Sequence, residues 1–241
     1  IFSKFIPHFI VTCSYKSTID HINSGFDQSK FITIHNGYDQ NRFRYNHEVK
    51  KNLRDKYHIK EKDIVFGFFG RFSEVKNLDL FLKAIKKLKT NQNFKYVFCG
   101  QGLNKDNLLF LKYLDKEFIE KNLVLLDYRH DIEKIFNMID CLVLTSFAES
   151  FPSVVCEAML TKIPCISTNV GDIKEIKGED DLILNSYSEI ELAEKMILFS
   201  KIPNSRIEKL KTYSRDRIMK QFSVNKMTKA YDDLYKKLVQ N

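Results

Sequence analysis

The sequence contains no uninterrupted apolar run that approaches the ~18 residues needed for a membrane-spanning helix. Its N-terminus also lacks the basic start, apolar middle and small-residue cleavage site of a signal peptide. We therefore expect a globular protein, and any membrane contact to be peripheral.

The five cysteines include no C-x-x-C pair, and the six histidines show no metal-ligand spacing with each other or with the cysteines. Cys99, Cys141 and Cys165 lie inside apolar runs that are typical of buried strands. This pattern predicts reduced, buried thiols in a cytoplasmic protein and no bound metal ion.

Several motifs of known chemistry are also missing. There is no G-x-S-x-G nucleophile elbow and no G-x-x-x-x-G-K-[ST] phosphate loop. A G-x-G at Gly100 and Gly102 follows an apolar run, but Lys105 stands where a dinucleotide-binding fingerprint needs its third glycine. A Rossmann oxidoreductase is therefore the least favoured of the functions considered.

The formal charge of +8 at pH 7 is spread along the chain, with denser patches at residues 83–90 and 206–220. No DNA- or RNA-binding module accompanies this charge, so we expect no nucleic-acid partner. Basic helices can lie on anionic membrane surfaces or meet phosphate-bearing ligands. A solvated lysine-rich helix face explains each patch more simply.

The sequence does have a regular alternation of short β-branched or aromatic runs with longer segments of helical period. With 44% apolar and 13% aromatic residues in 241, it can bury a substantial core. The strand-like runs are residues 9–13, 31–35, 63–70, 95–100, 123–127, 141–146, 164–168 and 182–184. This alternation predicts an α/β fold with a doubly wound, parallel, Rossmann-like sheet covered by helices on both faces.

One segment interrupts the rhythm and indicates two domains. Residues 41–62 are polar and charged and follow the turn-forming pair Asn36-Gly37, so we predict an interdomain linker there. Residues 1–40 then end one α/β domain, 63–222 form a complete second one, and 223–241 form a C-terminal helix with a serine cap. Because the sequence begins with isoleucine and reads straight into an apolar run, we expect an upstream portion of a longer protein.

Ligands of such sheets bind at the carboxyl ends of the strands, so the loops there carry the candidate site. The strand in 63–70 ends at Gly70, which is followed by Arg71 and, just before a helix, by Lys76. A guanidinium, an ammonium and a helix N-terminus together suit a diphosphate. An ordinary strand-to-helix turn with surface charges is the alternative.

Two further loops carry weaker patterns. Gly100 and Gly102 form a tight turn after the next strand, either beside a ligand or simply as a turn. Tyr128 and Arg129 follow another strand and could flank a planar nucleobase. A helix that begins at Asp131 would explain those polar residues equally well.

The segment ESFPSVVCEAML carries two carboxylates, Glu149 and Glu157. Pro152 stands where a helix commonly begins, which places Glu149 in the preceding loop and Glu157 in the second turn. Each carboxylate can accept two or more hydroxyl hydrogen bonds, and the helix N-terminus between them favours a phosphate. The pair therefore indicates a polyhydroxylated ligand.

Taken in this order, the four loops resemble the donor-binding half of GT-B glycosyltransferases of the group 1, retaining family 4 type. The family's G-R strand end with a lysine five positions later is matched at residues 70–76. Its G-x-G turn is matched at 100–102 and its E-x7-E element at 149–157. Its G-x-P-V-I-A-T-D-x-G-G segment is answered by TKIPCISTNVGD at 161–172, and the resemblance covers roughly residues 9–231.

The resemblance implies a role for each matched residue. Arg71 and Lys76 would hold the nucleoside diphosphate, and Glu149 would bind hydroxyls of the transferred sugar; these three are the implied catalytic residues. Glu157 would bind the ribose hydroxyls. The other implied donor-binding positions are Gly70, Gly100 and Gly102, Tyr128 and Arg129 near the base, and backbone groups of Ser150, Phe151 and Ser153 near the sugar.

The implied activity is the retaining, metal-independent transfer of a hexose from a nucleoside diphosphate sugar, with UDP-sugars favoured, to a glycan or lipid-linked acceptor. No cofactor is implied beyond that substrate. Bacterial surface polysaccharide synthesis, such as that of O-antigen, is the family's common role, in the cytoplasm or peripherally at the inner face of the cell membrane. By the same resemblance residues 1–40 end an acceptor domain whose larger part is missing, so we expect this chain alone to transfer nothing.

Two alternatives use the same fold: a nucleotide-sugar-binding module without catalysis, and a sugar-nucleotide epimerase. The sequence also departs from the family pattern. Pro152 stands where many members have glycine, and Asp172 replaces the second glycine of G-G. Thr161 and Lys162 replace a small residue and a glycine, which leaves the conformation of that turn open.

Overall fold

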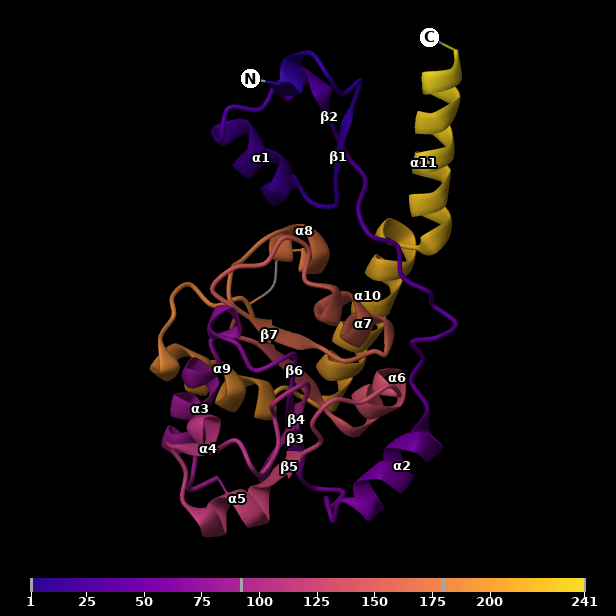
Figure 1. Cartoon of the computed structure of the whole chain (residues 1–241). Helices are drawn as coiled ribbons and strands as arrows, with labels where there is room; N and C mark the ends of the chain where they lie inside the picture. The colour runs from indigo at the N-terminus through magenta and orange to yellow at the C-terminus, as the bar shows by residue number, and fades with distance from the viewer. Residues whose placement is uncertain (1, 92, 179–180, 241) are drawn as a thin grey trace.

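The computed structural model describes residues 2–91, 93–178 and 181–240, and it contains two parallel sheets (Figure 1). The strands are β1 (Ile10–Thr12), β2 (Phe31–Thr33), β3 (Ile64–Phe69), β4 (Phe94–Cys99), β5 (Leu123–Leu125), β6 (Cys141–Leu144) and β7 (Cys165–Ser167). The α-helices are α1 (Tyr15–Asn23), α2 (His47–Lys56), α3 (Leu78–Lys87), α4 (Leu108–Leu111), α5 (Lys116–Asn122), α6 (Ile132–Ile135), α7 (Ser153–Leu160), α8 (Ile173–Lys177), α9 (Glu189–Ser200), α10 (Asn204–Gln221) and α11 (Val224–Val239). Short 3-10 helices are η1 (Phe2–Lys4), η2 (Gln28–Lys30), η3 (Glu74–Lys76) and η4 (Phe136–Met138).

The larger sheet has the strand order β5-β4-β3-β6-β7, with parallel neighbours throughout. Within this sheet the chain first forms the central strand β3 and then adds β4 and β5 on one side of it. It then returns to the other side of β3 and forms β6 and β7 there. Loops on the two sides of β3 therefore diverge, which opens a crevice at the carboxyl edge of the sheet. The doubly wound, Rossmann-like fold predicted from the sequence is confirmed.

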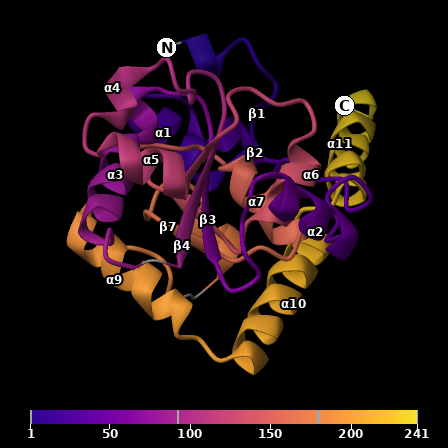
Figure 2. The same cartoon turned by 90° about the horizontal axis from the view of Figure 1, so that it is seen from below.

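Alternate residues of the central strand face opposite layers of helices. Val65 and Phe69 of β3 pack into a core shared with α7, whereas Phe66 and Phe68 pack into a core shared with α3 and α9. Figure 2 shows these layers, with α3 and α9 on one side of the sheet and α2, α7 and α10 on the other. Both faces of the strand are apolar because both are covered, as is usual in parallel sheets.

The smaller sheet pairs β1 with β2, and α1 lies beside it, above the larger sheet in Figure 1. The chain leaves this sheet through Gly37 and Tyr38, beside the junction of α10 and α11, where the Tyr38 N–H donates to Phe222 O at 2.8 Å. A Cβ on Gly37 would lie 2.7 Å from the Val224 Cα. The predicted turn at Asn36-Gly37 is wrong: the glycine permits a close crossing of two chain segments.

Residues 41–62, predicted as an interdomain linker, contain helix α2. Arg54 in this helix is buried, and its Nη2 lies 2.6 Å from Asp140 Oδ2 while its Nε donates to Met138 O at 3.1 Å. The Lys50 Nζ lies 2.7 Å from the other oxygen of Asp140. These contacts hold α2 on the segment that leads into β6.

Most predicted strands and the C-terminal helix occur where the sequence placed them. Ser223 caps α11, and its side chain accepts a hydrogen bond from the Lys226 N–H at 3.3 Å, as predicted. The run 182–184 does not form the predicted strand; Ile183 makes a single bridge to Ser167. The strand beside this run is β7, which is itself short and extends only from Cys165 to Ser167.

Candidate functional site

A cleft of about 700 Å³ lies at the carboxyl edge of the larger sheet. The predicted residues that line it are Gly70, Arg71, Lys76, Gly100, Tyr128, Arg129, Glu149, Phe151, Ser153 and Glu157. They come from the loops after β3, β4, β5 and β6 and from the first turns of α7. The structure thus brings together residues that are up to 87 positions apart, from Gly70 to Glu157.

At the floor of the cleft, two glycines follow the paired ends of β3 and β4 and let the backbones lie close together. The Gly70 N–H donates to Cys99 O at 2.9 Å, and the Gly100 N–H donates to Asp127 O at 2.7 Å. Gly100 has φ +148°, and a Cβ there would lie only 2.0 Å from Gly70 O. Glycine is therefore required at position 100 by backbone conformation and by space.

Lys76 and Glu149 form an ion pair inside the cleft, with Nζ 2.6 Å from Oε1. The same carboxylate oxygen accepts a hydrogen bond from Ser146 Oγ at 2.7 Å. The backbone at Lys76 is fixed as well, because its carbonyl accepts from Thr145 Oγ1 at 3.0 Å and the next residue, Asn77, takes the left-handed conformation with φ 46° before α3 begins. Arg71 is exposed at the same rim.

Glu157 lies on the second turn of α7, half-buried in the wall of the cleft. Burial raises the pKa of Glu157 to about 7; the guanidinium of Arg42 lowers this pKa and the carboxylate of Glu133 raises it further. The helix start is held by Tyr38, whose hydroxyl donates to Ser153 Oγ at 2.8 Å. The cleft therefore presents a carboxyl group that changes charge near neutral pH.

The loop after β5 is braced by acidic side chains. Asp127, with φ 49°, accepts hydrogen bonds from the Gly102 N–H at 2.9 Å and from Asn104 Nδ2 at 3.0 Å. These bonds, the Asn104 bond foremost, hold the pKa of the Asp127 carboxyl below its usual range. Gly102 thus lies beside the cleft as part of its support. Arg129 forms a bidentate ion pair with Asp131, in which Nε donates to Oδ1 and Nη2 donates to Oδ2, each at 2.8 Å.

Ser150 and Phe151 point toward the smaller sheet. Ser150 Oγ lies 2.6 Å from Ser14 Oγ, and Phe151 stacks on the ring of His35 with centroids 5.1 Å apart. The Asp172 N–H donates to Ser150 O at 3.1 Å, and a Cβ on Gly171 would lie 2.4 Å from the same oxygen. The side chains of both residues therefore contribute to the contact between the two sheets.

The family model of glycosyl transferases group 1 matches residues 49–217. The chain belongs to this family. The predicted membership and the GT-B assignment are therefore confirmed, and the matched range includes every residue that lines the cleft except Arg42.

Two curated relatives in this family illustrate its range. The chain is 28% identical over 188 residues to the Escherichia coli UDP-Gal:alpha-D-GlcNAc-diphosphoundecaprenol alpha-1,3-galactosyltransferase, covering 76% of this chain and 48% of the relative. It is 31% identical over 157 residues to a Campylobacter jejuni alpha-1,4-N-acetyl-D-galactosaminyltransferase that acts on an undecaprenol-diphosphate glycan, covering 61% and 42%. The chain thus spans about half the length of the curated relatives it matches.

Solved glycosyltransferases share the fold. Anabaena Alr3699/HepE, crystallised with UDP-glucose, superposes with a TM-score of 0.84 at 20% identity, over 98% of this chain and 65% of that one. A Rickettsia africae glycosyltransferase superposes with a TM-score of 0.82, also at 20% identity, over 100% and 67%. At this identity the likeness shows the fold alone.

The group 1 cleft contains residues that the sequence did not single out, Arg42, Gln101 and His130 among them. Arg42 lies in the predicted linker, where no strand end or glycine marked it. Within residues 2–91, 93–178 and 181–240, no group of three or more His, Cys, Asp or Glu side chains is placed to hold a metal ion. Nor does that part of the chain contain a helix with the length and apolarity to cross a bilayer.

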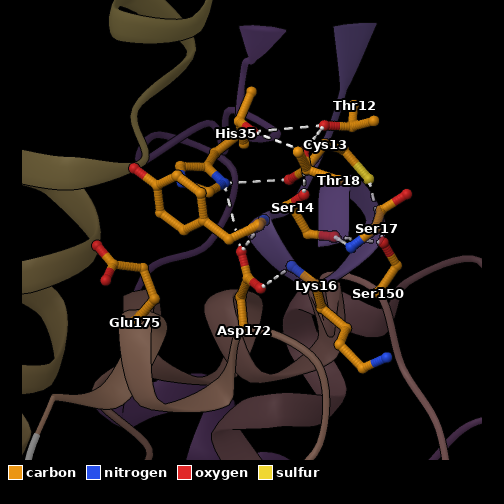
Figure 3. A network of polar contacts seen from close by, with 12 residues as sticks. Thr12, Cys13, Ser14, Lys16, Ser17, Thr18, His35, Ser150, Asp172 and Glu175 are labelled. Atoms are coloured by element: carbon orange, nitrogen blue, oxygen red, sulfur yellow. Dashed lines mark hydrogen bonds and ion pairs between the residues drawn. The ribbon is translucent and has the colours of Figure 1, made fainter. Parts of the chain in front are cut away.

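Asp172, which replaces a glycine of the family pattern, has a defined structural role (Figure 3). It stands at the start of α8, but its carboxylate accepts the backbone N–H groups of Tyr15 and Lys16 at 2.7 and 2.8 Å, at the N-terminus of α1. His35 Nδ1 lies 3.9 Å from the same carboxylate. The substituted residue therefore links the larger α/β unit to the smaller sheet.

Proposed function

We propose that the protein is a retaining glycosyltransferase that moves a hexose from a nucleoside diphosphate sugar to a glycan or lipid-linked acceptor. One observation carries the proposal: a single cleft is lined by Arg71, Lys76, Glu149 and Glu157. This cleft lies where the loops on the two sides of β3 diverge, in a chain that belongs to the glycosyl transferases group 1 family. Two cations and a helix N-terminus suit a diphosphate, and two carboxylates suit sugar hydroxyls.

The proposed chemistry needs stabilisation of charge on a departing nucleoside diphosphate while the sugar becomes oxocarbenium-like. Arg71, Lys76 and the N-terminus of α7 would supply it as preorganised positive groups, without a metal ion. Glu149 already holds Lys76 in place through its 2.6 Å ion pair and would accept hydroxyls of the sugar. Neither glutamate is proposed as a nucleophile, since orienting hydroxyls is sufficient for both.

The donor and acceptor classes are proposed from the relatives. Solved neighbours are described in complex with UDP and UDP-glucose, and curated relatives are named for undecaprenol-diphosphate acceptors. We therefore favour a UDP-sugar and a lipid-linked glycan of bacterial surface polysaccharide synthesis. The five free cysteines fit a reducing cytoplasmic setting, with any membrane contact peripheral.

The test is turnover of the full-length protein with UDP-sugars and a lipid-linked acceptor. Arg71→Ala and Lys76→Ala should each lower kcat by about 10²–10³, the cost of losing a contact that strengthens in the transition state. Lys86→Ala, an exposed lysine of α3, is the matched control and should leave turnover unchanged. Unchanged turnover in Arg71→Ala and Lys76→Ala would refute the assigned roles.

Product analysis separates the remaining possibilities. NMR of the product should show the anomeric configuration of the donor, and an inverted product would overturn the retaining assignment. UDP binding without hydrolysis or transfer would identify a non-catalytic binding module. An epimerised donor formed without acceptor would identify an epimerase.

A further inference from the structure

Ser146 lies between the end of β6 and Glu149, and its backbone is fixed from both sides. Its carbonyl accepts a hydrogen bond from Thr168 Oγ1 at 2.8 Å, just after β7. The next residue, Phe147, donates its N–H to Val75 O at 2.8 Å, in the short helix η3 after β3. Ser146 and Thr168 are buried, at 0% and 2% exposure. The serine hydroxyl therefore projects from a backbone that two neighbouring loops hold in place.

This hydroxyl and the ammonium of Lys76 contact the same oxygen of Glu149. Ser146 Oγ lies 2.7 Å from Glu149 Oε1, and Lys76 Nζ lies 2.6 Å from that atom. The serine is the donor, because a carboxylate only accepts hydrogen bonds. The side chains of Lys76 and Glu149 are 21% and 14% exposed, so the three groups meet where little water competes for them and such contacts are strong.

The other carboxylate oxygen of Glu149, Oε2, remains for a ligand. Each carboxylate oxygen offers about two acceptor sites, and Ser146 and Lys76 together occupy those of Oε1. In the part of the chain that the structure describes, no donor lies within hydrogen-bond distance of Oε2. Because Glu149 lines the cleft, Oε2 is the oxygen that can accept hydrogen bonds from a molecule bound there.

We propose that Ser146 is a positioning residue for the donor sugar, one that acts by holding Glu149 Oε1 so that Oε2 alone accepts a sugar hydroxyl. The inference rests on the proposed function, in which Glu149 is the sugar contact and Lys76 the diphosphate contact. A bound diphosphate draws on the ammonium of Lys76, whereas the hydroxyl of Ser146 stays on Glu149. Loss of this hydroxyl should therefore weaken recognition of the sugar and leave recognition of the diphosphate unchanged.

The test is calorimetric titration of this chain with UDP and, in parallel, with UDP-glucose, UDP-galactose and UDP-N-acetylglucosamine. The readout is the affinity for the tightest of the three UDP-sugars divided by the affinity for UDP. In Ser146→Ala this ratio should fall by about three- to tenfold, the scale of one lost hydrogen bond, while the affinity for UDP stays within about twofold of wild type. A purely structural loss would weaken both ligands together and leave the ratio unchanged.

Glu149→Gln tests whether Oε2 is the atom that contacts the sugar. Lys76 and Ser146 both donate, so they should bind the amide oxygen of this glutamine and leave its NH2 group in the place of Oε2. The ratio should fall by about tenfold, because a donor has replaced the acceptor. Adding Ser146→Ala to this variant should lower the ratio no further, since the two residues act on one contact.

Ser214→Ala is the matched control, because Ser214 is a buried serine of α10 that does not line the cleft. It should bind UDP and the UDP-sugars as the wild type does. An unchanged ratio in Ser146→Ala would overturn the proposal, and so would a double variant in which the two losses add in full, since Ser146 would then not act through Glu149. A wild-type chain that binds no UDP, or binds UDP but none of the three UDP-sugars, would instead refute the proposed function.

Discussion

Glu157, the proposed ribose contact, has a cost to stability that is visible at the scale of a single residue. The pKa of this carboxyl is about 7 in the folded chain against an ordinary value of 4.5, chiefly because of burial. A raised carboxyl pKa means that the folded state holds the proton more tightly than the unfolded one. Its contribution to stability is complete below about pH 4.5 and is lost as the pH rises toward 7, by up to roughly 3 kcal/mol.

Glu157→Gln should therefore stabilise the ligand-free chain, and by an amount that depends on pH. Glutamine resembles the protonated acid, so the gain in melting temperature should be near zero at pH 4, grow between pH 4.5 and 7, and reach several degrees at pH 8. Thermal denaturation followed by circular dichroism measures it. Glu194→Gln, on an exposed position of α9, should show no such trend. A pH-independent gain would contradict the linkage.

The end of α7 shows how an element tolerates an unfavourable residue. Lys162 has φ 61° and its N–H donates to Met159 O at 3.0 Å, while the Ile163 N–H donates to Ala158 O at 2.9 Å. This is a Schellman motif, which places a left-handed residue just after the helix and most often uses glycine there. The family's usual glycine at this position thus has a direct explanation, and lysine adopts the same turn under strain.

Lys162→Gly should stabilise the protein by about 0.5–1 kcal/mol, since relief of the left-handed strain exceeds the added entropy of the unfolded chain. Chemical denaturation should show a higher midpoint with an unchanged slope. Lys162→Ala is the matched control: it removes the same side chain but keeps a Cβ, so it should give no gain. Equal stabilisation by both variants would assign the effect to the lysine charge.

The elements were predictable because their signals are local. The start of α3 at Leu78 and of α7 beside Pro152 follow from glycine, proline and apolar periodicity within a few residues. The Lys76–Glu149 ion pair joins residues 73 positions apart, and Arg42 reaches the cleft from a segment with no strand-end signal. Such contacts depend on how finished elements pack, so no spacing in the sequence specifies them.

At the scale of the whole molecule, the two sheets are joined at several separate places. The chain crosses at Tyr38 beside the junction of α10 and α11, and α11 continues to the smaller sheet, where Lys237 Nζ lies 5.0 Å from the Phe9 ring centroid (Figure 1). The third contact is Asp172 with the N-terminus of α1 (Figure 3). This last contact lies beside the Glu149–Ser150 loop of the cleft, where Ser150 Oγ also lies 2.6 Å from Ser14 Oγ.

Asp172 should control the stability of α1 more than that of the larger sheet. Its carboxylate is buried, at 6% exposure, and accepts two N–H groups at the positive end of a nine-residue helix. Asp172→Ala leaves those donors unpaired, at an expected cost of about 2–3 kcal/mol. Hydrogen exchange should accelerate over residues 15–23, while β3 and β4, which lie in the core, keep their protection.

Asp20→Ala provides the comparison, since Asp20 pairs with Lys16 on the exposed face of the same helix. An exposed pair of this kind contributes less than about 1 kcal/mol, so exchange in α1 should change little. If Asp172→Ala left α1 as protected as in the wild type, the helix would be held by Ser14, whose side chain also caps it, and not by Asp172. If all regions lost protection together, the two sheets would unfold as one unit, and the contact at Asp172 would be part of a single cooperative fold.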